Sequence, residues 1–295
     1  MSQSKVKKRI LFGSIITAGL FGLALLDGYL EGTVTRAVGN GRAIKGTIIF
    51  AIVAVAMLLG QIELYKLAGG KKLRIFRTVT FTGTVLLAGS WYFSQFLRMS
   101  PAAYLSMVIC LSLLALMVQQ YLCCGTDSAI INCSVSLMAI VYLGLFSSFI
   151  MAIRIEFGLW YVIMFIAVIK SSDIGAYTVG SLIGRHKFAP KVSPGKTLEG
   201  LGGAMFAAAL TAVLFGRFAG IMGIGPALGF GLCFAVTGQM GDLFESMIKR
   251  DARQKDSSAA VPGFGGVLDI IDSPLIAAPF AYLFFYFLSN SAVAQ

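Results

Sequence analysis

Six ionisable side chains lie inside long apolar stretches of the second half of the sequence: Lys170, Asp173, Asp242, Glu245, Asp269 and Asp272. An ionisable residue in a membrane span costs about 3 kcal/mol or more, so it marks a functional site by default. Carboxylates that lie close together need a cation to stay ionised, and oxygen ligands beside phosphate select Mg²⁺. The residue types therefore indicate phosphate chemistry with Mg²⁺, although a cation-coupled transporter would bury carboxylates too.

Helical spacing sorts these side chains into groups. Asp242, Ser246 and Lys249 fall on one face of a helix, and Asp269 and Asp272 share a face where the last apolar stretch begins. Asp242 and Asp269 are then expected to meet from two helices that one loop connects. We predict these two carboxylates as metal ligands.

A third polar face lies earlier in the chain, where Lys170, Asp173 and Tyr177 are spaced three and four residues apart. Gly180 and Gly184 continue this face and would allow a second helix to approach closely. One interpretation makes Asp173 a site carboxylate that its lysine holds in place. The other is an ion pair that only holds helices together.

The loop 185–199 concentrates bases, hydroxyls, glycine and proline between two apolar stretches. Ser193, Lys196 and Thr197 could form a phosphate cradle, with Lys196 as a point charge and Thr197 near a helix start. The alternative is a loop that only orients the chain and binds anionic lipid head groups. His186, the one histidine, is interpreted as solvated or facing phosphate rather than as a catalytic base.

Composition determines the elements that must position these residues. The 295 residues are 57% hydrophobic and 13% charged, and their mean hydropathy is +0.84. In lipid every backbone polar group must be paired internally, and continuous rather than alternating apolar runs favour helices over a barrel. We predict an all-α polytopic membrane protein with about nine transmembrane helices. The expected spans are 10–27, 46–65, 78–96, 102–122, 129–153, 158–184, 200–216, 224–248 and 266–288.

The distribution of Lys and Arg predicts the orientation. With the N-terminus in the cytoplasm, 17 of the 24 basic residues fall in inner segments and 6 in outer ones, among them Arg154. This asymmetry is typical of a cytoplasmic N-terminus and places the C-terminus outside. The polar loops 66–77, 185–199 and 249–265 then face the cytoplasm. The net charge of +11 is explained by loop charges of this kind, and no nucleic-acid partner is expected.

The two halves of the chain differ in how they use charge. Residues 1–157 place almost no charge inside a span, whereas residues 158–295 place many charges there. We therefore expect an N-terminal group of about five structural, dimer-forming or lipid-facing spans. A C-terminal catalytic group of about four spans would follow it.

Four blocks of sequence between residues 170 and 275 add a more specific signal. They are Asp173 with Ala176-Tyr177; Ser193-Pro-Gly-Lys196-Thr-Leu-Glu199-Gly200; Gly241-Asp242 through Ser246-Met-Ile-Lys249-Arg250 to Lys255-Asp256; and Pro262-Gly-Phe-Gly265-Gly266 with Asp269-Ile-Ile-Asp272. In content, order and spacing these blocks resemble the signature of the phosphatidate cytidylyltransferase (CDP-diacylglycerol synthase) family. The resemblance implies that CTP and phosphatidate react to CDP-diacylglycerol and pyrophosphate, with Mg²⁺ as cofactor and a second cation left open.

The resemblance also implies roles for individual residues. The catalytic residues would be Asp173, Asp242, Lys249 and Asp269. Substrate and phosphate would be bound by Ser193, Lys196, Thr197, Ser246, Arg250, Lys255, Asp256, Gly265 and Gly266. The metal would be held by Asp242, Asp269 and Asp272. The family further implies a homodimer among membrane lipids, in the inner (cytoplasmic) membrane, with the active site facing the cytoplasm.

Two positions depart from the family pattern. Phe264 stands where the family usually has His, and Ile270 where it usually has Arg. A catalytically silent or substrate-shifted homologue is therefore an alternative, as is a cation-coupled transporter or lipid flippase.

We expect an active enzyme, because the carboxylates and bases of the pattern remain. The unaltered protein should then turn over CTP in an assay of pyrophosphate release. Activity that appears only after the double change Phe264→His and Ile270→Arg would instead establish the silent homologue.

Overall fold

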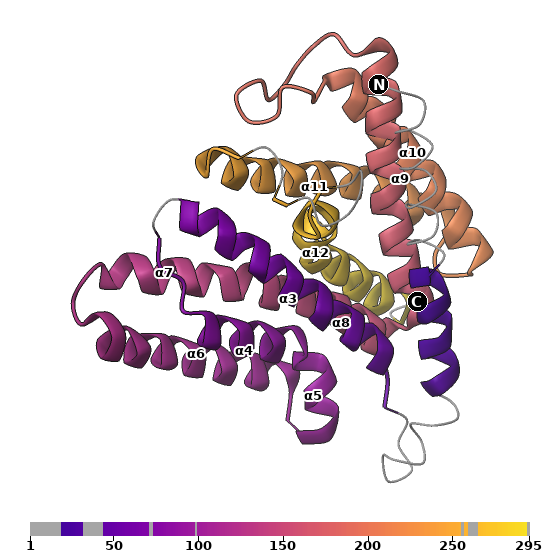
Figure 1. The fold of residues 1–295 in the computed structure, drawn as a ribbon. Helices are drawn as coiled ribbons and strands as arrows, with labels where there is room; N and C mark the ends of the chain where they lie inside the picture. The colour runs from indigo at the N-terminus through magenta and orange to yellow at the C-terminus, as the bar shows by residue number, and fades with distance from the viewer. Residues whose placement is uncertain are drawn as a thin grey trace. The chain divides into compact units, whose positions relative to one another are not determined.

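The computed structural model describes residues 19–31, 44–70, 73–97, 99–254, 257–258 and 265–293. Every regular element in these ranges is helical (Figure 1), and Lys187 and Thr197 form an isolated β-bridge. Residues 19–31 are helical as well. The labelled elements are α3 (Thr47–Gly70), α4 (Arg77–Ala88), α5 (Ser90–Leu97), α6 (Pro101–Cys124), α7 (Ala129–Ile140), η1 (Val141–Leu145), α8 (Phe146–Ala152), η2 (Ile153–Phe157), α9 (Leu159–Ile183), α10 (Leu198–Phe218), α11 (Ile224–Asp251) and α12 (Leu268–Val293). The all-α prediction is confirmed.

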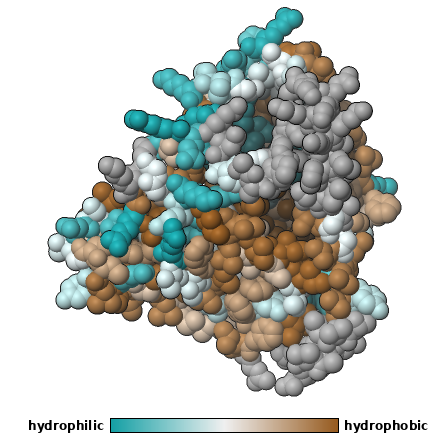
Figure 2. Space-filling view, in the orientation of Figure 1, coloured by the Kyte–Doolittle hydropathy of each residue, from teal (hydrophilic) through white to brown (hydrophobic). Residues whose placement is uncertain are grey.

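Seven helical segments in the described ranges are long and apolar enough to cross a membrane. They are Thr47–Gly70, Pro101–Cys124, Ala129–Phe157, Leu159–Ile183, Leu198–Phe218, Ile224–Asp251 and Leu268–Ser291. Each corresponds to one of the predicted spans. Figure 2 shows broad hydrophobic areas on the surface, and α6 exposes Leu111, Leu114 and Met117. Apolar side chains on this scale suit contact with lipid.

The remaining two of the nine predicted spans are not among these seven. The expected span 78–96 is divided into α4 and α5 at Gly89, so neither piece is long enough to cross a membrane alone. A Cβ at Gly89 would collide with the rings of Phe50 and Phe93, so these rings pack closely against the glycine. The expected span 10–27 lies largely outside the described residues. The orientation of the chain stays a prediction.

The chain divides into two compact units, and α12 begins in one and continues in the other. Unit 1 comprises Met1–Ile155 and Asp256–Ile270, and unit 2 comprises Glu156–Lys255 and Ile271–Gln295. The boundary near residue 155 lies close to the predicted division at 157, but the segment up to Ile270 groups with unit 1. The predicted roles of the two halves stay predictions.

In unit 1, α4 packs against α3, α6, α7 and η1. The core contains Leu87, Leu116 and Ile140 at the meeting point of these helices. Segment 129–157 is one helical rod that contains two π-helical turns, η1 and η2. At Gly144 in η1 a Cβ would meet the backbone of Thr84, so the close packing of η1 on α4 depends on glycine.

Buried charge in unit 1 corrects two statements made from the sequence. Arg154, which was counted as an outer loop charge, is 1% exposed and bonds Asp27 at 2.8 Å and Glu31 at 2.8 Å. Asp27 also accepts the backbone N–H of Ile48 at the start of α3. Glu63 is buried in α3 as well. The first half therefore does hold ionised groups in its interior, and a buried guanidinium needs such partners because its desolvation is costly.

In unit 2, α9 and α10 lie side by side, and α11 packs on α10 (Figure 1). Small residues make this contact possible: a Cβ at Gly175 of α9 would overlap the carbonyl of Gly203 and the methyl of Ala207. The predicted close approach at Gly180 is confirmed, since its partner across the contact is Gly200 of α10.

Gly175→Ala is expected to lower the free energy of unfolding by about 1–3 kcal/mol, because the added methyl overpacks the α9–α10 contact. Thermal unfolding of the detergent-solubilised protein measures the effect. Gly202→Ala is the matched control, since Gly202 has open space around it on the exposed side of α10. Equal unfolding temperatures for the two variants would contradict the packing explanation.

Candidate active site

The first polar cluster, in unit 2, is centred on Asp242 of α11. Lys196, in the loop before α10, donates from Nζ to Asp242 Oδ2 at 3.0 Å and to the carbonyl of Gln239 at 2.9 Å. The hydroxyl of Ser273 in α12 donates to Asp242 Oδ1. A lysine, a hydroxyl and a carboxylate from three segments thus meet at one place, with the lysine side chain 13% exposed.

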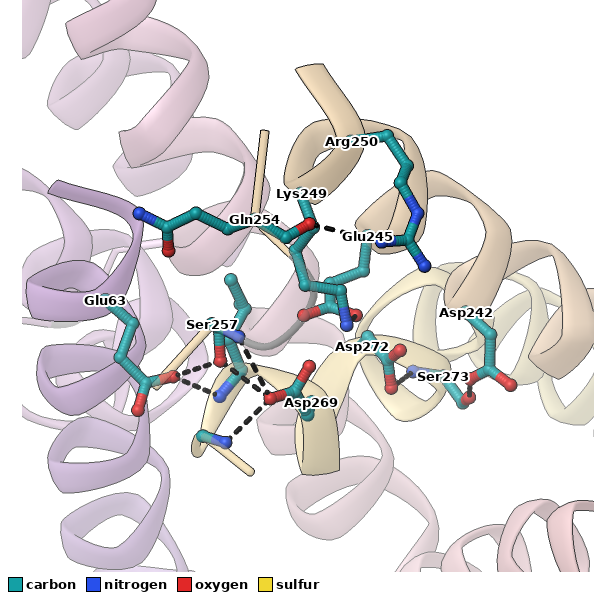
Figure 3. Close-up of polar contacts among 12 residues, drawn as sticks. Glu63, Asp242, Glu245, Lys249, Arg250, Gln254, Ser257, Asp269, Asp272 and Ser273 are labelled. Carbon is teal, nitrogen blue, oxygen red and sulfur yellow. Dashed lines mark hydrogen bonds and ion pairs between the residues drawn. The ribbon is translucent and has the colours of Figure 1, made fainter. Parts of the chain in front are cut away.

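Glu245 and Lys249, one turn further along α11, form a buried ion pair of 2.5 Å (Figure 3). Asp272 lies within electrostatic range of Glu245 and of Asp242, and its Oδ1 accepts the backbone N–H of Ser273 at 2.6 Å. The predicted grouping of Asp242 and Lys249 on one side of α11 therefore continues into α12 through Asp272.

Lys170 and Asp173 of α9 form the predicted ion pair, with 3.2 Å between Nζ and Oδ2. Asp173 lies within electrostatic range of Asp242 and Lys196 as well. Its second oxygen, Oδ1, is buried and has no hydrogen-bond partner among the described residues. The pair therefore belongs to the Asp242 cluster, and it leaves one carboxylate oxygen available. This favours the interpretation of Asp173 as a site residue.

The loop between α9 and α10 is held by its own polar groups. Thr197 is the N-cap of α10 and accepts the backbone N–H of Gly200 at 3.1 Å. Glu199 accepts the backbone N–H groups of Arg185 and His186, and its Oε1 lies 2.6 Å from Nδ1 of His186. His186 thus joins the two ends of the loop.

Ser193 and Arg250 also help to shape this loop. The carbonyl of Ser193 accepts the backbone N–H of Lys196 in a tight turn. Arg250 at the end of α11 donates from Nε to the carbonyl of Val192 at 3.3 Å. Arg250 thus contacts the loop from α11, and its guanidinium is exposed. Lys196 is held by the turn within the loop itself. A loop of this kind can present cationic groups to a phosphate.

The second polar cluster, in unit 1, connects α3 with the segment that starts α12 (Figure 3). Asp269 Oδ2 accepts the backbone N–H of Gly266 at 2.6 Å, the hydroxyl of Ser257 at 2.8 Å and the backbone N–H of Ser257 at 3.3 Å. The hydroxyl of Ser257 also lies 2.9 Å from Glu63 Oε2. Two carboxylates from distant parts of the sequence therefore share one seryl hydroxyl.

Gly265 and Gly266 have steric reasons to be glycine in this cluster. Gly265 has a φ of +95°, which side chains rarely adopt, and a Cβ there would meet Asp269. A Cβ at Gly266 would overlap Ser257 and Glu63. The structure thus gives both glycines a role in positioning the Asp269 carboxylate.

Sequence reasoning missed Glu63. The signal was present: Glu63 is an acidic residue in the long apolar stretch 47–65, where an ionisable group marks a functional site by default. It was overlooked because no other motif residue lies near it in the sequence.

The predicted meeting of Asp242 with Asp269 stays a prediction, because the two residues belong to different units. Lys255, Asp256 and Phe264 lie outside the described residues. Ser246 is half-buried on α11, one residue after Glu245. Within the described ranges, no three His, Cys, Asp or Glu side chains gather closely enough to hold a metal by themselves.

Comparison with known proteins identifies the family of this chain. The model of the cytidylyltransferase family matches residues 35–288, and the chain belongs to this family of nucleotidyl-transferring enzymes. The chain is 32% identical over 259 residues to the phosphatidate cytidylyltransferase of Bacillus subtilis, which covers 86% of this chain and 94% of that one. It is 40% identical over 136 residues to the phosphatidate cytidylyltransferase of Haemophilus influenzae, about half of each chain. An uncharacterised protein of Escherichia coli, YnbB, is 42% identical over 135 residues.

Lys249→Met is expected to destabilise the protein by about 3–5 kcal/mol, because it removes the ion-pair partner of a Glu245 carboxylate that is 2% exposed. The double variant Glu245→Gln, Lys249→Met should recover much of this loss, since a neutral pair no longer requires burial of a charge. Thermal unfolding of the three proteins in detergent checks the expectation. A double variant no more stable than the single one would contradict it.

Proposed function

We propose that this chain is an integral-membrane cytidylyltransferase that condenses CTP with phosphatidate to CDP-diacylglycerol and pyrophosphate. The observation that carries the proposal is the Asp242 cluster, in which Lys196, a hydroxyl and several carboxylates meet beside apolar helices. Anionic phosphates and a lipid substrate need this combination of cationic side chains, acidic side chains and lipid-facing surface. The relatives named phosphatidate cytidylyltransferase support the choice of substrates.

The reaction is a displacement at phosphorus. A phosphate oxygen of phosphatidate attacks the α-phosphorus of CTP, a new P–O bond forms, and the bond to the β-phosphate breaks to release pyrophosphate. The nucleophile is already an anion, so no general base is required. Lys196, Lys249, Arg250 and Lys255 would neutralise phosphate oxygens, and charge-assisted hydrogen bonds of this kind are among the strong ones in proteins.

Lys196 and Lys249 would have to exchange partners to do this. Lys196 is paired with Asp242, and Lys249 with Glu245. A triphosphate that approaches the cluster would compete with these carboxylates for the lysines. The carboxylates would then be available to a cation, so substrate binding and cation binding are expected to support each other.

The chemistry of the donors suits Mg²⁺. Asp173 Oδ1 is a buried carboxylate oxygen with no hydrogen-bond partner in the described part of the chain, and Asp242 and Asp272 lie within electrostatic range of each other. Mg²⁺ is usually held by one or two carboxylates together with substrate phosphates and water, so a cage of three protein carboxylates is not required. Asp242, Asp269 and Asp272 would hold the ion, with a second cation left open. When bound, it would neutralise the triphosphate and the leaving pyrophosphate.

The setting of the reaction is part of the proposal. The excess of Lys and Arg in alternate loops supports a cytoplasmic N-terminus and a site that faces the cytoplasm, in the inner membrane. The substrates are CTP and a membrane lipid. We further propose that the protein forms a homodimer and that it does not bind nucleic acid.

Asp242→Asn is expected to lower turnover of CTP by at least about 100-fold, because it removes charge where a metal and phosphates are proposed to bind. Asp269→Asn should do the same. The assay uses purified protein, Mg²⁺ and phosphatidate, and it measures CDP-diacylglycerol and pyrophosphate.

Asp251→Asn is the matched control, since Asp251 is an exposed carboxylate at the end of the same helix, α11. It should keep near-normal turnover. Full activity of Asp242→Asn or of Asp269→Asn would refute the metal assignment for that residue. Ion-dependent solute flux in proteoliposomes without turnover of CTP would replace the proposed enzyme by a transporter.

A further inference from the structure

Glu63 is the acceptor of four hydrogen bonds in the second polar cluster. Its Oε1 accepts the hydroxyl of Ser258 at 2.6 Å and the backbone N–H of Val267 at 3.0 Å. Its Oε2 accepts the hydroxyl of Ser257 at 2.9 Å and the backbone N–H of Leu268 at 2.8 Å. Both oxygens therefore face one hydroxyl and one backbone donor each, in a buried position.

This pattern requires a carboxylate. The N–H groups of Val267 and Leu268 can only donate, and each points at a different oxygen of Glu63. A glutamine has one oxygen and one NH₂ group, so in either orientation its amide nitrogen would face a backbone donor. Leu268 is the first residue of α12 and has no partner for its N–H within the helix. Glu63 thus also caps α12, and its negative charge suits the helix N-terminus.

The contact with Ser257 reaches Asp269. The hydroxyl of Ser257 has a single proton, yet it lies 2.9 Å from Glu63 Oε2 and 2.8 Å from Asp269 Oδ2. It can donate to only one of the two carboxylates at a time. When Glu63 takes this proton, the backbone N–H groups of Ser257 and Gly266 still donate to Asp269 Oδ2 and fix its position.

We infer that Glu63 is a positioning residue for the reaction: it holds Ser257, Ser258 and the start of α12 in place, so that the Asp269 carboxylate is fixed where the proposed cation would bind. The inference rests on the proposed function for its effect on turnover. The placement of Ser257, Ser258 and the start of α12 does not depend on the proposed function, because it follows from the four hydrogen bonds to Glu63. Residues that orient a ligand in this way typically change activity by about 10–100-fold when they are altered.

The test compares Glu63→Gln with Gln61→Met. Gln61 lies on the same helix, is equally buried and accepts a hydrogen bond from Thr84 rather than from Ser257, Ser258 or the start of α12. Glu63→Gln should lower kcat by about 10–100-fold with a smaller change in the KM for CTP. It should also raise the concentration of Mg²⁺ needed for half-maximal rate. Gln61→Met should leave both quantities close to those of the unaltered protein.

Hydrogen exchange supplies a readout that does not need turnover. The amides of Ser257, Gly266, Val267 and Leu268 should exchange faster in Glu63→Gln and unchanged in Gln61→Met. A folded Glu63→Gln protein with kcat within twofold of normal would overturn the inference. So would a loss of turnover with unchanged exchange at these amides.

Two further outcomes are separable. If Glu63→Gln does not fold, Ser258→Ala decides, because it removes one donor to Glu63 Oε1. It should raise exchange at Val267 and Leu268 and lower kcat, and no change in either would overturn the inference. If the unaltered protein makes no CDP-diacylglycerol, the proposed function fails. Faster exchange in Glu63→Gln would still establish that Glu63 positions Ser257 and the start of α12.

Discussion

The burial of charge among apolar helices is the constraint on which the rest of this structure depends. An ionised group in such surroundings must be paired or hydrogen-bonded, because its desolvation is otherwise uncompensated. Arg154 meets this requirement with two carboxylates, and Glu245 with a lysine one turn away. Glu63 meets it with four donors from a distant segment. These partnerships determine where loops and helix starts are held.

The polar clusters differ in whether all of their charged groups have hydrogen-bond or ion-pair partners. The Arg154 group satisfies its guanidinium with Asp27 and Glu31, and Asp27 also caps a helix, so its role is structural. The Asp242 cluster contains one carboxylate, Asp272, beyond those that its three lysines pair with. One oxygen of Asp173 also has no hydrogen-bond partner in the described ranges. A buried carboxylate oxygen without a hydrogen-bond partner could accept a cation, which supports the role proposed for the Asp242 cluster.

Glycine has a chemical as well as a steric role just before α12. Gly265 and Gly266 let the backbone pass so close to Asp269 and Glu63 that its N–H groups and the hydroxyl of Ser257 reach the carboxylates. The sequence pattern around these glycines is therefore explained by hydrogen bonding to acidic side chains.

The sequence by itself determined the helical class, seven of the spans and the short-range pairs. Continuous apolar runs in lipid permit only internally bonded backbones, and pairs such as Lys170–Asp173 follow from the helical repeat. The break at Gly89 was not predicted, and the packing of Phe50 and Phe93 against that glycine is visible only in the tertiary structure.

The tertiary structure alone decided the partners that are far apart in the chain. Lys196 was expected at a phosphate and Asp242 at a metal, yet they bond each other across 46 residues. Arg154 was expected in a loop, and it is buried against Asp27. Glu63 bonds Ser257, which lies 194 residues away in the sequence, and sequence analysis predicted no role for Glu63. Residue periodicity reports on one helix at a time, whereas these contacts depend on which helices pack together.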